Sequence, residues 1–539
     1  MRWFVLGSTD YRHAIGRLSS LPRAMWPDSV DSGGRGLLFT TPMCTTKRAP
    51  RSVFLALLFV FLTTGRGQDT KSQYKEILSD SEKIYGLAEF WKEASYNFAH
   101  FDHVSDLDWN ATFVEYVPKV LEAKSTKEYY RVLMRFAALL KDGHTGVYPP
   151  TEVTGIGHYD KAPIAAKSIG HRAIIVNVEK RFADQIPLGS EIVAVDGVPT
   201  EDYLKTNVIP YVGASADHAL WEAAVVGYSP WGLGIAAGQP GTEVAFTIRT
   251  PDGQERSVRM VRDADKRAAA GQLEMVVPES NAPKPMIEHR WLEDSLFYVA
   301  LNSFNDRAIA DRFKQEVVPE LAKAKGVIID IRTNGGGSTE NGTAILDYFV
   351  DQPLKGSAWR TREHVAAYKA WATFGDQKYL PYLKGDAWHT GEHHEFKPSE
   401  GPKFLVPVVV LTSVYTGSAA EDFLIFVDGL DRFTTVGEPT FGSTGQPIQF
   451  QLPGGGRARI CSKRDTYPDG RDFVGYGVKP QVPVERTPAS LIGKEDPVLK
   501  KGVEVLKGKF QGKLGELGTV PNSPEASHSF LPPFGPLNH

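Results

Sequence analysis

Residues 411–421 have the sequence Leu-Thr-Ser-Val-Tyr-Thr-Gly-Ser-Ala-Ala-Glu and follow an apolar run from Phe404 to Leu411. The pattern predicts a buried strand, a turn at Gly417 and a helix that begins at Ser418. A serine hydroxyl at such a turn can meet a substrate carbonyl beside the unpaired backbone amides of the helix start. Because Glu421 lies one turn into the helix, the stretch is also typical of a capping box, which needs no chemistry.

A second apolar run, Gly326–Arg332, predicts another buried strand that leads into Thr333-Asn-Gly-Gly-Gly-Ser338. Successive glycines allow a tight turn with backbone amides free to face a ligand. Such amides can form an oxyanion hole, which stabilises the negative charge that develops on a substrate carbonyl. A plain glycine-rich turn or an anion-binding nest is the alternative. A Walker-type phosphate loop is disfavoured because no Gly-Lys-Ser/Thr follows.

These segments and several further motifs occur in an order that is known from one peptidase family. In chain order the motifs are Asp142-Gly-His-Thr145, a PDZ-like block, Asp330-x-Arg-x-Asn-Gly-Gly-Gly337, Thr416-Gly-Ser-Ala-Ala-Glu421, Val436-Gly-Glu-Pro-Thr-Phe-Gly442 and Gly475-Tyr-Gly-Val-Lys-Pro480. On these residues the chain resembles the C-terminal-processing (tail-specific) serine peptidase family, from about residue 75 to 505. The resemblance implies an α/β fold with a crotonase-like ββα-spiral protease core, and it implies that Ser418 is the nucleophile.

One departure from the better-known branch of this family concerns the general base. That branch pairs the serine with a lysine in a Phe-Gly-Lys-Gly segment, whereas Phe441-Gly-Ser-Thr-Gly445 has Ser443 at the lysine position. The motif Asp142-Gly-His-Thr145 resembles the other branch, in which a histidine and a carboxylate serve the serine. We therefore predict that His144 is the general base, since neutral imidazole can take and return a proton near physiological pH. A histidine that is merely hydrogen-bonded at the end of an apolar helix is the alternative.

The resemblance also implies a carboxylate that orients His144 and lies shortly before the Gly-x-Gly-Val-x-Pro segment. Asp472 fits this place best, although aspartate is shorter than the glutamate often found there. Asp469 is more typical of a β-turn residue, and Glu485 is a weaker candidate. Lys463 is the alternative base if the histidine interpretation is wrong. The amides predicted to form the oxyanion hole belong to Gly335, Gly336, Gly337 and Ala419.

Composition agrees with a multidomain enzyme and gives no sign of a cofactor. The chain has 539 residues and 42% hydrophobic content, enough to bury two or three cores. The formal charge of −3, with both signs interspersed, gives no electrostatic case for binding nucleic acid. The two cysteines, Cys44 and Cys461, have no spacing typical of a zinc or redox site, and the pair His393-His394 lacks a partnering motif. We expect neither a metal nor a cofactor.

Residues 43–67 have the features of a signal peptide. A basic stretch, Lys47–Arg51, precedes the apolar run Ser52–Leu62, which is too short to span a bilayer as a helix. Residues 1–42 lack comparable organisation and are unassigned, so translation could start at Met43. We expect a secreted or periplasmic protein with no stable membrane insertion after cleavage. An uncleaved membrane anchor is the alternative.

The rest of the chain divides into regions of different character. Aromatic and apolar residues at helical spacing predict an N-terminal helical cap that delivers His144 to the site. The segment Ile186–Pro199 resembles a PDZ segment, a module that accepts an extended peptide as an added strand. Alternating strands and helices then predict an α/β core. The expected boundaries are 70–150 for the helical domain, 155–262 for the PDZ-like domain, 285–505 for the peptidase core and 508–539 for a disordered tail.

The main hypothesis is a serine endopeptidase that cleaves protein or peptide substrates through Ser418, His144 and Asp472. A non-catalytic protein that binds peptides or apolar ligands on the same fold is the alternative, because a fold does not fix a function. An acyl-CoA enzyme of the crotonase type shares the architecture, but the signal peptide argues against a cytosolic substrate.

Overall fold

The structure, a computed structural model, describes residues 74–155, 157–227, 232–278 and 284–510. All of them belong to one structural unit that begins at Gln68. The predicted signal peptide and the unassigned residues before it lie outside the described residues, as does the predicted tail beyond residue 510. The first residues of that tail form the end of helix α14 (Pro497–Phe510). In the described part of the chain, no helix combines the length and the hydrophobicity that crossing a membrane requires.

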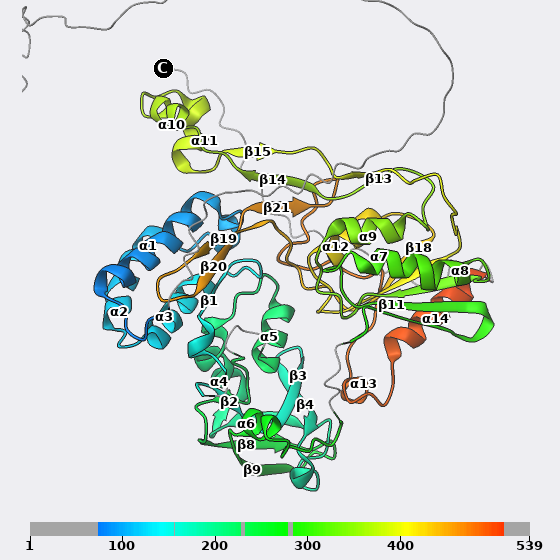
Figure 1. Cartoon of the computed structure of the whole chain (residues 1–539), viewed down its shortest axis with the longest axis horizontal. Coiled ribbons are helices and arrows are strands. Elements are labelled where there is room, and N and C mark those ends of the chain that lie inside the picture. Colours follow the sequence, from blue (N-terminus) through cyan, green and yellow to red (C-terminus); the bar gives the residue numbers. More distant parts are fainter. Residues whose placement is uncertain (1–73, 156, 228–231, 279–283, 511–539) are drawn as a thin grey trace, which may run out of the picture. The chain divides into compact units, whose positions relative to one another are not determined.

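The first region consists of helices that pack against a small sheet (Figure 1). The helices are α1 (Asp80–Asn97), α2 (Trp109–Glu122) and α3 (Thr126–Ala138). Their core contains a stacked aromatic pair, Trp109 and Phe136, whose ring centroids lie 4.3 Å apart. The sheet has the order β1-β20-β19, formed by β1 (Gly146–Tyr148), β20 (Arg457–Cys461) and β19 (Pro447–Gln451). A hairpin from late in the chain therefore completes the core of the N-terminal helices.

The second region is an antiparallel sheet with the order β3-β4-β5-β8-β9. Its strands are β3 (Ile164–Ile169), β4 (Arg172–Val178), β5 (Glu191–Val195), β8 (Glu243–Arg249) and β9 (Glu255–Val261). Buried and more exposed residues alternate along β3 and β8, as expected for a sheet with one face toward a core. The core also contains side chains of α4 (Thr200–Asn207) and α5 (Asp217–Val226). The PDZ-like identity of this region stays a prediction.

Short elements complete the second region. They are β2 (Asp160–Lys161), β6 (Val198–Pro199), β7 (Ala237–Gly238) and α6 (Ala264–Ala269). β6 pairs with β5, and β2 pairs with β7.

The third region is built on a six-stranded sheet with the order β10-β11-β12-β17-β18-β22, parallel except for β10. Along β17, Val408 and Val410 pack on one face of the sheet, whereas Val409 and Leu411 pack on the other face with α14. Because both faces are covered, these strands are continuous apolar runs in the sequence. The strands are β10 (Ile287–Trp291), β11 (Leu296–Leu301), β12 (Gly326–Asp330), β17 (Val408–Thr412), β18 (Phe433–Gly437) and β22 (Val482–Pro483).

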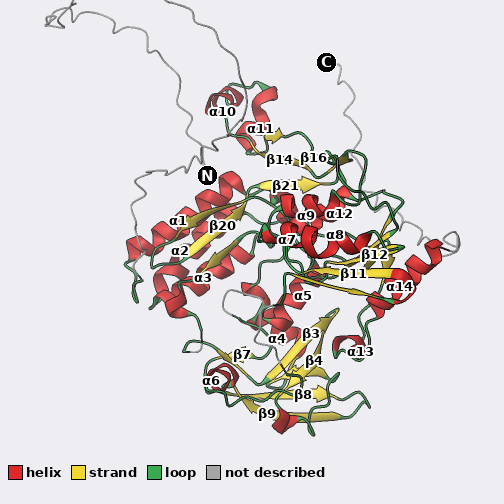
Figure 2. Ribbon diagram, turned by 45° about the vertical axis from the view of Figure 1, so that its right-hand side comes forward, coloured by secondary structure: helices red, strands yellow, loops and turns green. Residues whose placement is uncertain are grey.

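Helices on one face of this sheet form its larger core. Figure 2 shows them grouped on one side of β11 and β12. They are α7 (Ala308–Arg312), α8 (Val318–Leu321), α9 (Thr339–Leu346) and α12 (Ala419–Phe426). The prediction of a core that mixes strands and helices is confirmed.

The segment between α9 and β17 adds short strands and helices to the core. Strand β14 (Ala358–Arg362) pairs with β15 (Trp388–Thr390) and with β21 (Lys463–Thr466), which follows β20 in the chain. The other elements are β13 (Leu354–Lys355), β16 (Glu395–Phe396), α10 (Ala366–Ala372) and α11 (Leu380–Lys384) in this segment, and α13 (Pro488–Leu491) before α14.

Candidate active site

Ser418 lies at the turn between β17 and α12, where the sequence predicts it. Its backbone has φ 54° and ψ −125°, a conformation that residues with a side chain rarely adopt. Glu421 accepts a hydrogen bond from the Ser418 N–H at 3.0 Å, which is one half of the predicted capping box. The Ser418 hydroxyl lies 3.3 Å from Nε2 of His144. A strained strand-to-helix turn that presents a hydroxyl to an imidazole is typical of a nucleophilic serine.

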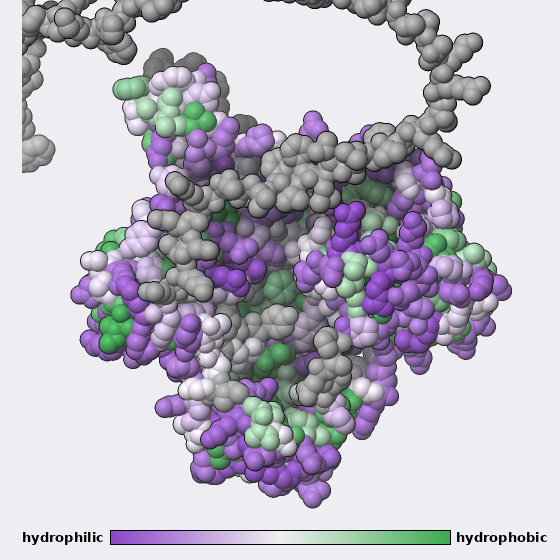
Figure 3. Space-filling view, in the orientation of Figure 1, coloured by the Kyte–Doolittle hydropathy of each residue, from purple (hydrophilic) through white to green (hydrophobic). Residues whose placement is uncertain are grey.

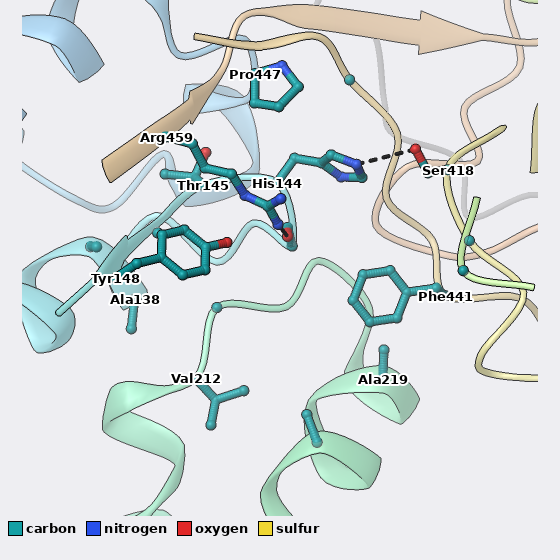
Figure 4. Close-up of a pocket in the computed structure, with 18 of the residues that line it drawn as sticks. Ala138, His144, Thr145, Tyr148, Val212, Ala219, Ser418, Phe441, Pro447 and Arg459 are labelled. Atoms are coloured by element: carbon teal, nitrogen blue, oxygen red, sulfur yellow. Dashed lines mark hydrogen bonds between the residues drawn. The ribbon is translucent and has the colours of Figure 1, made fainter. Parts of the chain in front are cut away.

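His144 lies in the loop between α3 and β1, and Figure 4 shows its ring directed at Ser418. Hydrogen bonds fix this loop: Asp142 Oδ1 accepts from the His144 N–H at 2.9 Å, and Arg459 donates to the carbonyl of Gly143 at 2.7 Å. Burial lowers the pKa of His144 to about 3, with smaller contributions from nearby cations. The imidazole is therefore neutral at physiological pH, the form in which Nε2 can accept a proton.

The structure does not bring the predicted orienting carboxylate to the imidazole. Arg464 holds Asp472 by donating to both of its carboxylate oxygens at 3.1 and 3.0 Å. Asp469 pairs with a neighbouring arginine in its turn, and Glu485 is exposed. Among the described residues, none of these three carboxylates makes a hydrogen bond to His144. The expected role of Asp472 therefore has no support in this geometry, because a guanidinium already binds its carboxylate.

Lys463, the alternative base, forms an ion pair with Asp465 with 3.0 Å between Nζ and Oδ1. Burial by itself would lower the pKa of Lys463, but the carboxylate of Asp465 outweighs this effect and raises it. The ammonium group is therefore protonated at physiological pH and is unsuited to accept a proton from a serine.

Ser443 occupies the place beside His144 that a carboxylate was expected to fill. Its buried hydroxyl oxygen lies 2.7 Å from Nδ1 of His144. Its backbone carbonyl accepts from the Ser418 N–H at 3.3 Å, so the loop that carries Ser443 also contacts the predicted nucleophile directly. The sequence contains a signal for this residue, since Ser443 stands where the better-known branch has its lysine. From the sequence, a serine at this position predicts only that the lysine base is missing. It does not predict that the serine hydroxyl contacts the imidazole of His144.

Glu421 joins the helix that follows Ser418 to the loop that carries Ser443. Its carboxyl group accepts from the N–H groups of Ser418 at 3.0 Å, Gly442 at 2.7 Å and Ser443 at 3.2 Å, and from the hydroxyl of Thr440. Burial raises the pKa of Glu421 to about 8, although these hydrogen bonds act in the opposite direction. Glu421 therefore positions the two serines without touching the space where a substrate would react.

The glycine run after β12 contributes two amides that face the site. Gly335 and Gly337 line the same cavity as the predicted nucleophile, and neither N–H has a hydrogen-bond partner in the described part of the chain. Over the same residues the N–H of Ala419 is also free. The amide of Gly336 differs, because it donates to the side-chain oxygen of Asn334 at 3.0 Å. Of the four amides predicted for the oxyanion hole, Gly336 is therefore already engaged.

Ser418 and His144 open onto a cavity of about 770 Å³ between the three regions (Figure 4). Figure 3 shows this face of the molecule hollowed, with hydrophobic surface inside the recess. The charged side chains that line the cavity are Glu222 and Arg459. Much of the remaining lining is apolar and includes Met134, Val147, Tyr148, Val212, Ala219 and Val414. A cavity that combines apolar side chains with placed polar groups is typical of a ligand-binding site.

Comparison with known sequences relates the third region to a peptidase family. The sequence profile of Peptidase family S41 matches residues 295–484. A carboxyl-terminal-processing protease of Picosynechococcus sp. is 24% identical over 312 residues, which cover 55% of this chain and 65% of that protein. The carboxy-terminal processing protease CtpA of Bacillus subtilis is 23% identical over 221 residues, 41% of each protein. The chain thus spans less than two thirds of the length of these relatives.

Solved structures with a similar fold include two of mature CPAF. The crystal structure of mature CPAF has a TM-score of 0.60 at 18% identity and covers 82% of this chain and 99% of that one. Mature CPAF complexed with lactacystin gives a TM-score of 0.58 at 17% identity, over 80% and 98% of the two chains. The matched part of the chain is therefore similar in sequence to the predicted peptidase family. The histidine-using branch stays a prediction.

Proposed function

We propose that this protein is a serine endopeptidase in which Ser418 is the nucleophile and His144 is the general base. The observation that carries the proposal is the 3.3 Å contact between Ser418 Oγ and His144 Nε2, made by residues 274 positions apart and facing one cavity. In the first step Nε2 takes the hydroxyl proton as Oγ attacks the peptide carbonyl. The imidazolium then protonates the leaving amine, and a water molecule repeats the cycle to release the acyl group.

In this proposal Ser443 orients the imidazole. Nε2 can accept a proton only if the ring proton lies on Nδ1, and Nδ1–H then donates to Ser443 Oγ at 2.7 Å. A hydroxyl carries no charge, so it fixes the ring but stabilises the imidazolium less than a carboxylate would. The lowered pKa of His144 agrees with such an uncharged partner. Asp472 takes no part in this scheme.

The proposed oxyanion hole consists of the free N–H groups of Gly335, Gly337 and Ala419. Ala419 follows the proposed nucleophile in the chain, and Gly335 and Gly337 line the cavity that Ser418 faces. Hydrogen-bond donors that are already in place when charge develops need no reorganisation, and losing one typically costs about 10²- to 10³-fold in rate. The engaged amide of Gly336 has a different role, which is to keep the loop close to the nucleophile.

We propose extended polypeptide segments as the substrates. A cavity of about 770 Å³ admits several side chains and excludes a folded domain. The curated relatives are named carboxyl-terminal-processing proteases, so the C-terminal parts of proteins are the first substrates to test. The predicted signal peptide makes a secreted or periplasmic location part of the proposal. A non-catalytic peptide-binding protein is the competing function.

Two readouts with matched variants separate these functions. We expect the parent and the exposed-site control Ser105→Ala to hydrolyse an unfolded protein such as reduced casein and to react with a serine-directed fluorophosphonate. Ser418→Ala should do neither while its melting temperature stays unchanged. His144→Ala should lose about 10²- to 10⁴-fold in rate, the usual contribution of a general base. Hydrolysis by Ser418→Ala at the parent rate would exclude the proposed nucleophile, and a parent that binds casein without reacting would favour the binding protein.

A further inference from the structure

Three possible metal ligands from distant parts of the chain meet behind the His144 loop. His100 follows α1, Asp142 precedes His144 by two residues, and Cys461 ends β20. One ligand atom of each lies within 4.8 Å of the other two, and all three residues are buried. A backbone hydrogen bond of 3.1 Å from the Ala99 N–H to the Cys461 carbonyl holds the first and last of these segments together. Their wide spacing in the sequence explains why no metal motif is visible there.

In this cluster, the buried imidazole of His100 has unsatisfied ring nitrogens that could bind a metal. Its side chain is nearly inaccessible, with 1% exposure, and neither ring nitrogen has a hydrogen-bond partner among the described residues. Its packed neighbours are the rings of Phe98 and His103, with centroids 6.0 and 5.0 Å away. Buried polar groups are nearly always satisfied, and an unsatisfied one is destabilising. A group that binds an imidazole nitrogen at this position would remove that cost.

The other two side chains also offer a ligand atom each. Asp142 accepts from the His144 N–H and from the Ser215 hydroxyl, which leaves further lone pairs on its two oxygens. Cys461 is a free, buried cysteine whose thiol donates to the backbone carbonyl oxygens of Thr444 and Lys463 at 3.5 and 3.4 Å, two weak hydrogen bonds that the thiolate exchanges for a bond to the metal. A thiolate and a carboxylate balance the charge of a divalent cation. The cationic side chains near the cluster, Arg360 and Arg464 beside His100 and Lys463 beside Cys461, would therefore face a bound ion whose charge its own ligands neutralise.

We propose that His100, Asp142 and Cys461 form a structural Zn²⁺ site. Nitrogen, thiolate sulfur and carboxylate oxygen are the donor atoms that zinc prefers. In a tetrahedral site these atoms lie roughly 3.3–3.8 Å apart, so the cluster must close by about 1 Å on binding, with water in the fourth position. The ion ties the end of α1 and strand β20 to the His144 loop, because Asp142 is both a ligand and the acceptor of the His144 N–H. This assignment replaces the expectation of a metal-free protein and does not depend on the proposed peptidase activity.

The test uses the full chain with a tag that contains no histidine. After purification with zinc present and removal of loosely bound metal, elemental analysis should find about one equivalent of zinc. Replacement by Co²⁺ should give a thiolate-to-cobalt charge-transfer band. Cys461→Ser should lose the band and the bound zinc, as should His100→Ala, whereas the control His393→Ala should keep both.

If a variant fails to fold, the cobalt spectrum of the unmutated protein still tests the proposal. Absence of the cobalt band in the folded parent protein would overturn the proposal, as would a band that persists in Cys461→Ser. Ser418→Ala should retain the metal, which separates a failure of this site from a failure of the proposed peptidase.

Discussion

Replacing Ser443 with alanine should lower kcat by roughly 5- to 150-fold while KM stays nearly constant. The change removes the hydrogen-bond partner of His144 Nδ1, which lies 2.7 Å away and is the only one within the described residues. A buried donor left without an acceptor costs about 1–3 kcal/mol, and each 1.36 kcal/mol corresponds to about tenfold in rate. Ser443 contacts the imidazole and does not line the cavity, so substrate binding should be spared.

The assay compares Ser443→Ala with Asp472→Asn, a variant that keeps the volume of the side chain and removes its charge. Steady-state hydrolysis of a fluorogenic peptide gives kcat and KM separately, and the rate of fluorophosphonate labelling reports the reactivity of Ser418 independently. We expect Asp472→Asn to stay within about twofold of the parent, because Asp472 is 37% exposed and makes no contact with His144, and because the buried Arg464 keeps its second partner, Asp102. Thermal melting of both variants checks that each remains folded.

The opposite pattern would refute the reasoning. If Ser443→Ala keeps the parent kcat and Asp472→Asn loses it, then a carboxylate orients the imidazole and the loop of Asp472 must move when substrate binds. An equal loss of kcat in both variants would mean that Ser443 and Asp472 act together, which also contradicts the proposed scheme.

Two further predictions follow from the surroundings of the site. Gly336→Ala should abolish activity, because φ is +100° at Gly336 and an added Cβ would lie 2.7 Å from the Cβ of Ser418. Gly335→Ala should retain most of the activity, because an added Cβ there would meet no atom within 4 Å. The hydrolysis rates of the two variants test this prediction. Glu421, whose pKa burial raises to about 8 from 4.5, binds a proton more tightly when the protein is folded. Its contribution to stability is therefore complete below about pH 4.5 and is lost as the pH rises to about 8, with a slope of up to about 1.4 kcal/mol per pH unit. In urea unfolding, Glu421→Gln should show a flatter pH dependence than the parent over this range, and an unchanged slope would contradict the assignment.

The local pattern of apolar residues was sufficient to predict the strands and the helix around the proposed nucleophile. The apolar run at 326–332 contains β12, and α12 begins directly after Ser418. The strand predicted at 404–411 is shorter, because β17 begins only at Val408. These features could be predicted because a strand that is buried on both faces must be apolar along its whole length, and because a helix start has a local signature. The approach of His144 to Ser418 was expected only from a family resemblance, since no periodicity links residues so far apart.

What the sequence by itself determined, then, were the segments and the residue types able to do chemistry. Only the tertiary structure decided which side chains become partners. Arg464 binds Asp472, and Ser443 is the residue that contacts Nδ1 of His144. The same holds for His100 and Cys461, which no motif connects and which meet because β20 completes the N-terminal core. The physical reason is that strands and helices follow from short-range patterns of burial, whereas the partner of a buried polar group depends on which distant segments pack beside it.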